Sequence, residues 1–181
     1  MKNRNNNKSI LGFILSAIIT LTWLPIVDAK TQTQAGFNLP KLSGGTVSAE
    51  SLRGKVVVLA VAASWLPLSQ DQAKGINRLV TTYTPKNVEF FWVFTDSGNA
   101  KSKNYASDAD LLNFAKTNSL RINLLRDSDG VEMKKLGVSQ VPAFVILDKS
   151  GSKFGTLIEG IDPETNSTAK IEKGIDDALK N

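Results

Sequence analysis

Residues 55–70 read "KVVVLAVAASWLPLSQ", and this stretch decides the fold. Its first half is β-branched and apolar without alternation, which is typical of a strand covered on both faces, as in a parallel sheet. Its second half contains Trp65 and Pro67, and the residues that follow place Ala73 and Ile76 at the spacing of a helix. The stretch therefore predicts a buried strand that turns directly into a helix.

Strands and helices alternate on both sides of this stretch. Before it, residues 37–55 predict a short hairpin that turns at Gly44-Gly45, since glycine accepts positive φ. After it, Ser107 and Asp110 form a capping-box pattern at the start of a helix. The expected strands cover residues 88–95, 122–127, 142–148 and 153–160, and the expected helices cover 70–83, 107–120, 129–138 and 162–180. Such alternation indicates an α/β fold with parallel crossovers, to which the late hairpin adds an antiparallel edge.

Composition limits the classes of function. The chain has 181 residues, with 41% hydrophobic and 22% charged residues, which suits one globular domain. The formal net charge is +5, but no basic stripe with interleaved aromatic residues is seen, so a nucleic-acid partner is not expected. The chain contains no cysteine and no histidine, and it has no phosphate-binding glycine motif. We therefore expect no disulfide, no metal and no cofactor.

The N-terminus predicts export. Residues 1–29 have the layout of a secretory signal peptide: a basic start, an apolar stretch and small side chains before a cleavage point after Ala29. The alternative is an uncleaved membrane anchor formed by residues 9–27. Its apolar run of roughly 18 residues is only just long enough to span a bilayer. Residues 30–36 predict a flexible leader, and residues 37–181 the folded domain. Both alternatives place the domain outside the cytoplasm, periplasmic or secreted, with membrane contact only if the segment stays uncleaved.

The order of elements, the stretch "LRGKVVV", Trp65-x-Pro67 and the later "VPAFVILD" together resemble the thioredoxin-like superfamily, in its TlpA/ResA-type redoxin (AhpC/TSA-like) branch. The resemblance covers roughly residues 37–180. It implies a thioredoxin-like fold, with a mixed central sheet flanked by helices and an N-terminal hairpin extension. It also implies that Pro142 follows a cis bond and faces the Trp65 turn. Val141 would then offer backbone groups to an extended peptide.

The sequence departs from the family at the residues that carry the redox chemistry. Family members carry W-C-x-x-C at the turn, whereas Leu66 and Ser69 stand at the two cysteine positions here. Leucine cannot act as a nucleophile, and Ser69 has no histidine to activate it, although Lys74 is one nearby candidate base. The alternative is that Ser69 is only a first-turn or capping residue of the helix. Ala60 occupies the position, six residues before the first thiol, where the family often has a buried polar or acidic side chain.

Three functions remain open. The first is a non-redox binding or scaffolding module for an extended peptide or protein partner, with no catalytic residue. The second is the family activity, thiol-disulfide oxidoreductase or peroxidase, which is disfavoured because both reactions run through sulfur. The third is a degenerate copy without a binding role. The candidate binding residues are Trp65, Leu66, Pro67, Ser69, Val141 and Pro142. Leu66 either contributes to an exposed apolar patch or packs against Pro142 and seals the old site.

Two acidic features are weaker candidates. Asp96 follows a predicted central strand, at the edge where α/β proteins often bind ligands, but one carboxylate does not make a site. Residues 127–130, "DSDG", resemble a fragment of a calcium loop that lacks the remaining ligands. The simpler interpretation of this fragment is a turn that caps a helix.

Overall fold

The computed structural model describes Met1, residues 35–160 and residues 167–181. The predicted signal segment or anchor, residues 30–34 of the leader, and the expected start of the last helix near Pro163 lie outside these described residues. Among the described residues, no helix combines the length and the apolar character that crossing a bilayer requires.

The domain is built on a five-stranded mixed sheet with the order β5-β4-β3-β6-β7. Parallel pairing joins β3 to β4 and β4 to β5, whereas β6 runs antiparallel to both β3 and β7. Every residue of β3 is buried, which explains why its sequence does not alternate. The strands are β3 (Val56–Ala62), β4 (Val88–Phe94), β5 (Asn123–Arg126), β6 (Ala143–Leu147) and β7 (Lys153–Glu159).

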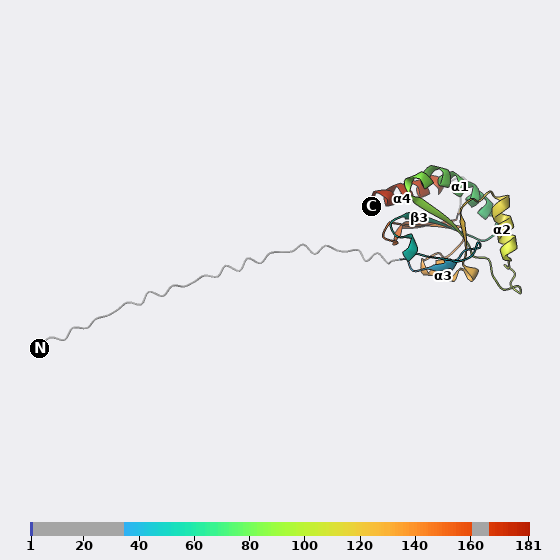
Figure 1. The fold of residues 1–181 in the computed structure, drawn as a ribbon, viewed down its shortest axis with the longest axis horizontal. Helices are drawn as coiled ribbons and strands as arrows, with labels where there is room; N and C mark the ends of the chain where they lie inside the picture. Colours follow the sequence, from blue (N-terminus) through green and yellow to red (C-terminus); the bar gives the residue numbers. More distant parts are fainter. Residues whose placement is uncertain (2–34, 161–166) are drawn as a thin grey trace. The chain divides into compact units, whose positions relative to one another are not determined.

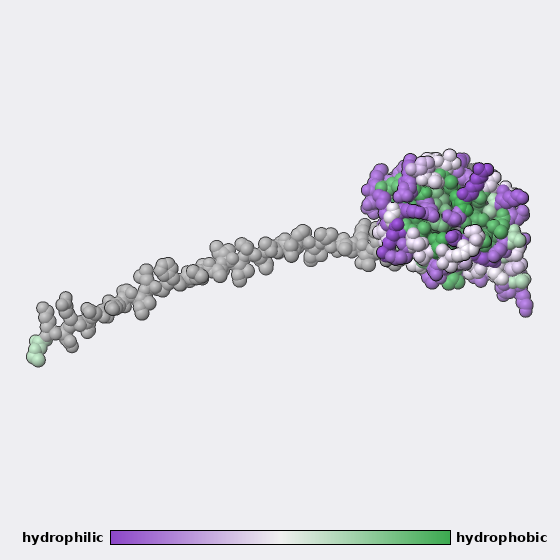
Figure 2. Space-filling view, in the orientation of Figure 1, coloured by the Kyte–Doolittle hydropathy of each residue, from purple (hydrophilic) through white to green (hydrophobic). Residues whose placement is uncertain are grey.

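Helices and a small hairpin cover the two faces of this sheet (Figure 1). One face carries α1 (Pro67–Tyr83), α2 (Asp108–Thr117) and α4 (Ser167–Lys180). The other face carries α3 (Val131–Lys135) and the hairpin of β1 (Asn38–Pro40) and β2 (Thr46–Ser48). Short 3₁₀ helices occupy Glu50–Leu52, Thr84–Lys86 and Ser128–Gly130. Figure 2 shows polar residues on the outer sides of the helices and hydrophobic residues in the band between the layers.

The predicted order of elements is confirmed, and so is the mixed thioredoxin-like sheet with its N-terminal hairpin. The capping box at Ser107 and Asp110 is also present. Some boundaries differ: α2 and α3 are shorter than expected, and α1 begins at Pro67, three residues before the apolar spacing indicates. Proline suits the first position of a helix because its missing N–H would be unpaired there anyway.

The described chain enters the domain at the end opposite the Trp65 turn. Ala35 is buried, and its N–H donates to the carbonyl of Gly151 over 3.0 Å, in the turn between β6 and β7. Pro142 lies at the other end of β6, next to its first residue. The elements that hold the candidate residues therefore lie at the end of the sheet opposite the Ala35 contact.

Candidate functional site

The turn after β3 presents three of the candidate residues at the surface. Leu66 is the N-cap residue of α1 and Pro67 its first residue. The turn is closed by the Leu66 N–H, which donates to the Ala63 carbonyl over 3.1 Å. Trp65 is 54% exposed, Leu66 is half-buried and Pro67 is exposed. A strand thus leads into a helix through a turn whose outer surface is largely apolar.

Ser69 is fully buried in the first turn of α1. Its hydroxyl donates to the Ala63 carbonyl over 2.8 Å, and its N–H donates to the Leu66 carbonyl over 3.0 Å. Lys74, the candidate base, instead forms a surface ion pair with Asp71 over 2.9 Å. A hydroxyl without solvent access or a base has no route to nucleophilic attack, so this geometry gives Ser69 a structural role.

The loop before β6 contains the expected cis peptide bond, between Val141 and Pro142. Pro142 is buried, and its carbonyl accepts the N–H of Gly160 over 2.8 Å. Val141 is half-buried, and within the described part of the chain neither its N–H nor its C=O is hydrogen-bonded. Backbone N–H and C=O groups usually find partners, and those of Val141 have none within the described residues. They are therefore open to pairing with an incoming chain.

Glu159, the last residue of β7, holds this loop in place. Its carboxylate accepts the Ser139 N–H over 2.7 Å, the Gln140 N–H over 3.2 Å and the Ser139 hydroxyl over 3.0 Å. These hydrogen bonds, the Ser139 N–H first among them, lower the pKa of Glu159 below its usual value. The charged carboxylate therefore orders the two residues that precede Val141.

The order of this loop should depend on pH. Because the pKa of Glu159 is lower in the folded protein, its contribution is complete above the usual carboxyl pKa and is lost as the pH falls through the folded pKa. We expect the hydrogen-exchange protection factors of the Ser139 and Gln140 amides to fall over that acidic range. Glu159→Gln should lower them at neutral pH and remove the dependence, whereas Glu89→Gln, at the opposite end of the sheet, should change neither. A wild-type profile that stays flat would contradict the clamp.

Asp96 stabilises the Trp65 turn through hydrogen bonds to Ser64. It is 1% exposed, and both carboxylate oxygens lie 3.0 Å from the Ser64 N–H, while the Ser64 hydroxyl donates over 2.6 Å. The carboxylate is thus occupied in fixing the residue that precedes Trp65. We therefore assign Asp96 a positioning role in place of the ligand contact that its location first indicated.

The "DSDG" stretch caps a helix. The buried carboxylate of Asp127 accepts the N–H groups of Glu132 and Met133 over 3.0 and 2.7 Å, at the start of α3. This is the simpler of the two sequence interpretations. Within residues 35–160 and 167–181, no group of three or more acidic, histidine or cysteine side chains is placed to hold a metal ion.

Beneath the turn the core holds no acidic or basic side chain at the position of the family's proton relay. Ala60 is fully buried and faces Trp92 on the neighbouring strand. One polar residue does reach the site from α1: Gln72 is 1% exposed, and its Nε2 donates to the Ala143 carbonyl over 2.7 Å. Gln72 thereby ties α1 to the residue that follows Pro142. The only signal for Gln72 in the sequence is that it is a polar residue on the buried side of a helix.

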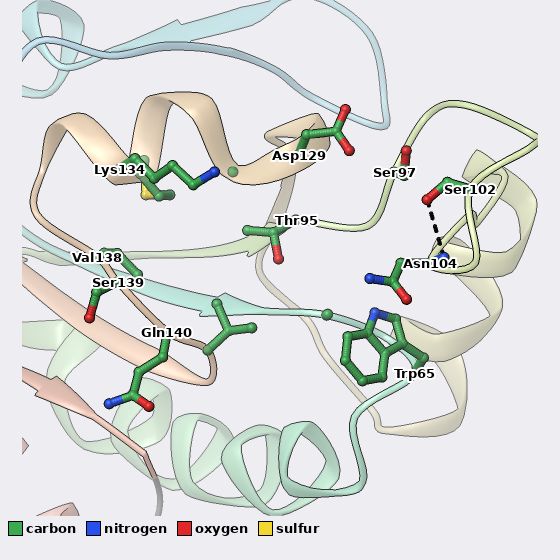
Figure 3. A pocket seen from close by; sticks show the side chains of 14 residues that line it. Trp65, Thr95, Ser97, Ser102, Asn104, Asp129, Lys134, Val138, Ser139 and Gln140 are labelled. Carbon is green, nitrogen blue, oxygen red and sulfur yellow. Dashed lines mark hydrogen bonds between the residues drawn. The ribbon is translucent and has the colours of Figure 1, made fainter.

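A pocket of about 410 Å³ brings two of the candidate residues together. Trp65 and Val141 both line it, whereas Leu66, Pro67, Ser69 and Pro142 do not. Figure 3 shows the Trp65 indole on one side, next to Asn104, with Gln140 and Lys134 on the opposite side and Thr95 between them. The contributions of α3 and of the loop after β4 were not foreseen, because these segments lie far from the turn in the sequence.

Arg126, at the end of β5, fixes the loop that forms the outer wall of this pocket. Its guanidinium donates to the carbonyls of Ser97 and Ala106 over 3.2 and 2.6 Å, and it pairs with Asp108 at the start of α2. The side chain is 13% exposed. One arginine therefore closes the segment from residue 97 to residue 106 into a defined shape.

The chain belongs to the AhpC/TSA family, since a model of that family matches residues 31–152. A search among curated proteins gives no match. The family and the fold agree with the resemblance seen in the sequence, and the site described above lies within or next to the matched residues.

Three solved structures illustrate the likeness in fold. MTB DsbF is 22% identical, with a TM-score of 0.64, and the match covers 80% of this chain and 96% of that one. A candidate thiol:disulfide interchange protein DsbE from Chlorobium tepidum is 23% identical, with a TM-score of 0.68 and coverage of 81% and 95%. A secreted Mycobacterium tuberculosis disulfide oxidoreductase homologous to E. coli DsbE is 22% identical, with a TM-score of 0.62 and coverage of 79% and 96%. At these identities the likeness establishes the fold alone.

Proposed function

We propose that this protein is a binding module without redox chemistry, which holds an extended peptide or an extended segment of a protein partner. The peptide would lie on a surface formed by Trp65, Leu66, Pro67 and Val141, called here the peptide face. The observation that carries the proposal is the unpaired backbone of Val141, held next to a helix start that lacks any nucleophile. No nucleic acid, metal or cofactor enters this proposal.

Backbone pairing is the mode of binding that this loop supports. An extended peptide adds to exposed N–H and C=O groups as an extra strand, and pockets for alternate side chains then supply specificity. Val141 offers one such donor and one such acceptor, and Glu159 orders the residues before it. A loop that is already ordered costs less entropy on binding.

The family's redox activity is the less favoured alternative. Thiol-disulfide exchange needs a thiolate that attacks a disulfide, and the family's peroxide chemistry needs a sulfur that is oxidised. Leucine at position 66 has no such atom, and the Ser69 hydroxyl is buried against the Ala63 carbonyl. We expect the protein to reduce insulin with dithiothreitol, and to consume peroxide, at background rates only.

The proposed place of action is outside the cytoplasm. The support is the signal-like layout of residues 1–29, together with the fact that one structural relative is a secreted protein. Terminal sequencing of the exported protein tests this part: a chain that begins at Lys30 supports cleavage. A full-length chain that stays in the membrane would instead make residues 9–27 an anchor.

Leu66→Asp tests the peptide face. The new carboxylate would have to lose water where the peptide packs, a cost on the order of 1–3 kcal/mol, which corresponds to a roughly ten- to hundredfold weaker peptide affinity. The probe is a blocked heptapeptide, Gly-Ser-Thr-Xaa-Thr-Ser-Gly, whose threonines favour an extended chain. The affinity is measured by calorimetry on the full chain, with a mixture of peptides that differ only at the central residue Xaa.

Leu112→Asp is the matched control, since Leu112 is an exposed leucine on α2, outside the peptide face. It should leave the affinity within about twofold, because an exposed substitution away from the contact disturbs little. Equal affinities for the two aspartate variants would remove the peptide face as the binding surface. Loss of the folded circular-dichroism signal in Leu66→Asp alone would show that Leu66 seals the old site.

A further inference from the structure

The pocket beside Trp65 has an apolar base. Ala63, Met133 and Val138 are buried there, with exposures of 2%, 1% and 6%, and Val141 adds a half-buried side chain. The Trp65 indole stands at the side, more than half exposed. A ligand group that enters this base would therefore contact hydrocarbon and an aromatic ring.

Two hydroxyls near the base each already form one hydrogen bond within the protein. The Thr95 hydroxyl donates to the Ala62 carbonyl over 3.1 Å, and the Ser97 hydroxyl accepts the Asn99 N–H over 3.2 Å. Among the described residues, the buried side-chain polar atoms without a partner belong to Gln72 and Trp92, and neither residue lines the pocket. A polar group that entered the base would lose its water and find few partners besides these two hydroxyls, so an apolar group is favoured there.

The rim carries exposed polar groups, one of which, the Gln140 side-chain amide, also hydrogen-bonds the Glu159 carboxylate. Asn104 and Gln140 present exposed side-chain amides on opposite sides of the opening, and both are labelled in Figure 3. Lys134 and Asp129 also line the pocket, and neither forms an ion pair within the described residues. Their charges are opposite, so the mouth favours neither sign. Amides at the rim match the amide groups of a peptide backbone on either side of one inserted side chain.

We infer that this pocket is the specificity subsite for one large apolar side chain, aromatic or long aliphatic, of the peptide that pairs with Val141. The inference rests on the proposed peptide-binding function, because Val141 belongs both to the pocket and to the peptide face. The volume of about 410 Å³ is ample for such a side chain and its neighbouring backbone. The loop from residue 97 to residue 106, closed by Arg126, supplies the outer wall.

The test varies one residue of the probe. Five blocked heptapeptides, Gly-Ser-Thr-Xaa-Thr-Ser-Gly with phenylalanine, leucine, serine, aspartate or lysine at the centre, are titrated separately into the full chain. We expect the phenylalanine and leucine peptides to bind about tenfold or more tightly than the other three. Trp65 fluorescence, taken as the difference between wild type and Trp65→Phe, should change on binding of the two apolar peptides only.

A matched pair of variants locates the effect. Lys134→Phe fills the pocket from α3 and should reduce the preference for apolar centres to about twofold or less. Lys135→Phe changes the neighbouring exposed lysine, which does not line the pocket, and should keep the preference. The comparison of five peptides on wild-type protein needs no variant, so it stands even if a substitution impairs folding.

The outcomes separate the subsite from the function. Equal binding of all five peptides, still weakened by Leu66→Asp, would overturn the subsite and leave the peptide face in place. A preference for the aspartate or lysine peptide would also overturn the subsite, because the rim would then dominate recognition. Failure of every peptide to bind would overturn the subsite and the proposed function together.

Discussion

Replacing Leu66 and Ser69 together by cysteine should create an internal disulfide and convert a redox-inert protein into a measurable insulin reductase. Leu66 is the N-cap of α1 and Ser69 lies one turn further, where the Ser69 N–H donates to the Leu66 carbonyl over 3.0 Å. Residues three apart at this point are about 5–6 Å apart, which a disulfide can bridge. The helix dipole should lower the pKa of the outer thiol below the free value of about 8.5.

The reaction should stay slower than in the thiol-containing relatives. Ala60 supplies no group that moves a proton, and the second thiol would be buried where the Ser69 hydroxyl now donates to Ala63. Thiol titration under mild oxidant comes first, followed by the insulin assay against wild type. Leu66→Cys alone is the control, since it has no second thiol. Two thiols that stay unpaired, with no lowered pKa, would show that this helix start does not match the family's redox turn.

Arg126→Met should be the most destabilising single change at the surface of the site. It leaves the Ala106 carbonyl without its guanidinium donor and removes the partner of Asp108. The Ser97 carbonyl loses one of its two donors and keeps the Ala106 N–H. An unpaired buried carbonyl costs about 1–3 kcal/mol, and the lost Ser97 hydrogen bond and ion pair add about 1 kcal/mol, so we expect the free energy of unfolding to fall by roughly 2–4 kcal/mol. For a domain of this size that corresponds to a fall in Tm of roughly 5–15 °C.

Arg121→Met provides the control for this change. Arg121 is exposed in the turn before β5, and the same substitution there should alter stability by less than about 0.5 kcal/mol. Urea unfolding followed by circular dichroism measures both variants. If the unfolding curves of Arg126→Met and Arg121→Met coincide, Arg126 does not stabilise the loop that forms the outer wall of the pocket.

The fold was predictable because its signals are local in the sequence. The uninterrupted apolar run of β3, the capping box at Ser107 and the alternation of strands with helices each depend on neighbouring residues. The start of α1 was less clear, since apolar spacing begins only at residue 70 while the helix begins at Pro67. The spacing marks the face that packs on the sheet, and the first turn precedes that face.

The site was predictable only in part, because its supports join distant segments. The sequence predicts that the Trp65 turn and the Val141-Pro142 loop share one surface, and Trp65 and Val141 line the same pocket. Arg126 reaches back 29 residues to Ser97, and Glu159 reaches back 20 residues to Ser139. Nothing in the local sequence of either residue marks it as an anchor. These contacts follow from strand order and register, which a single sequence specifies only through the complete fold.

The account depends most directly on the backbone amide of Val141, which is unpaired within the described residues and which the proposal assigns to the bound peptide. Its hydrogen-exchange rate should be compared in the free full chain and in the chain saturated with the phenylalanine heptapeptide. We expect rapid exchange in the free protein and strong protection in the complex, with the protection reduced in Leu66→Asp and kept in Leu112→Asp. An amide that exchanges equally fast with and without bound peptide would contradict β-pairing at Val141 and the proposed binding function with it.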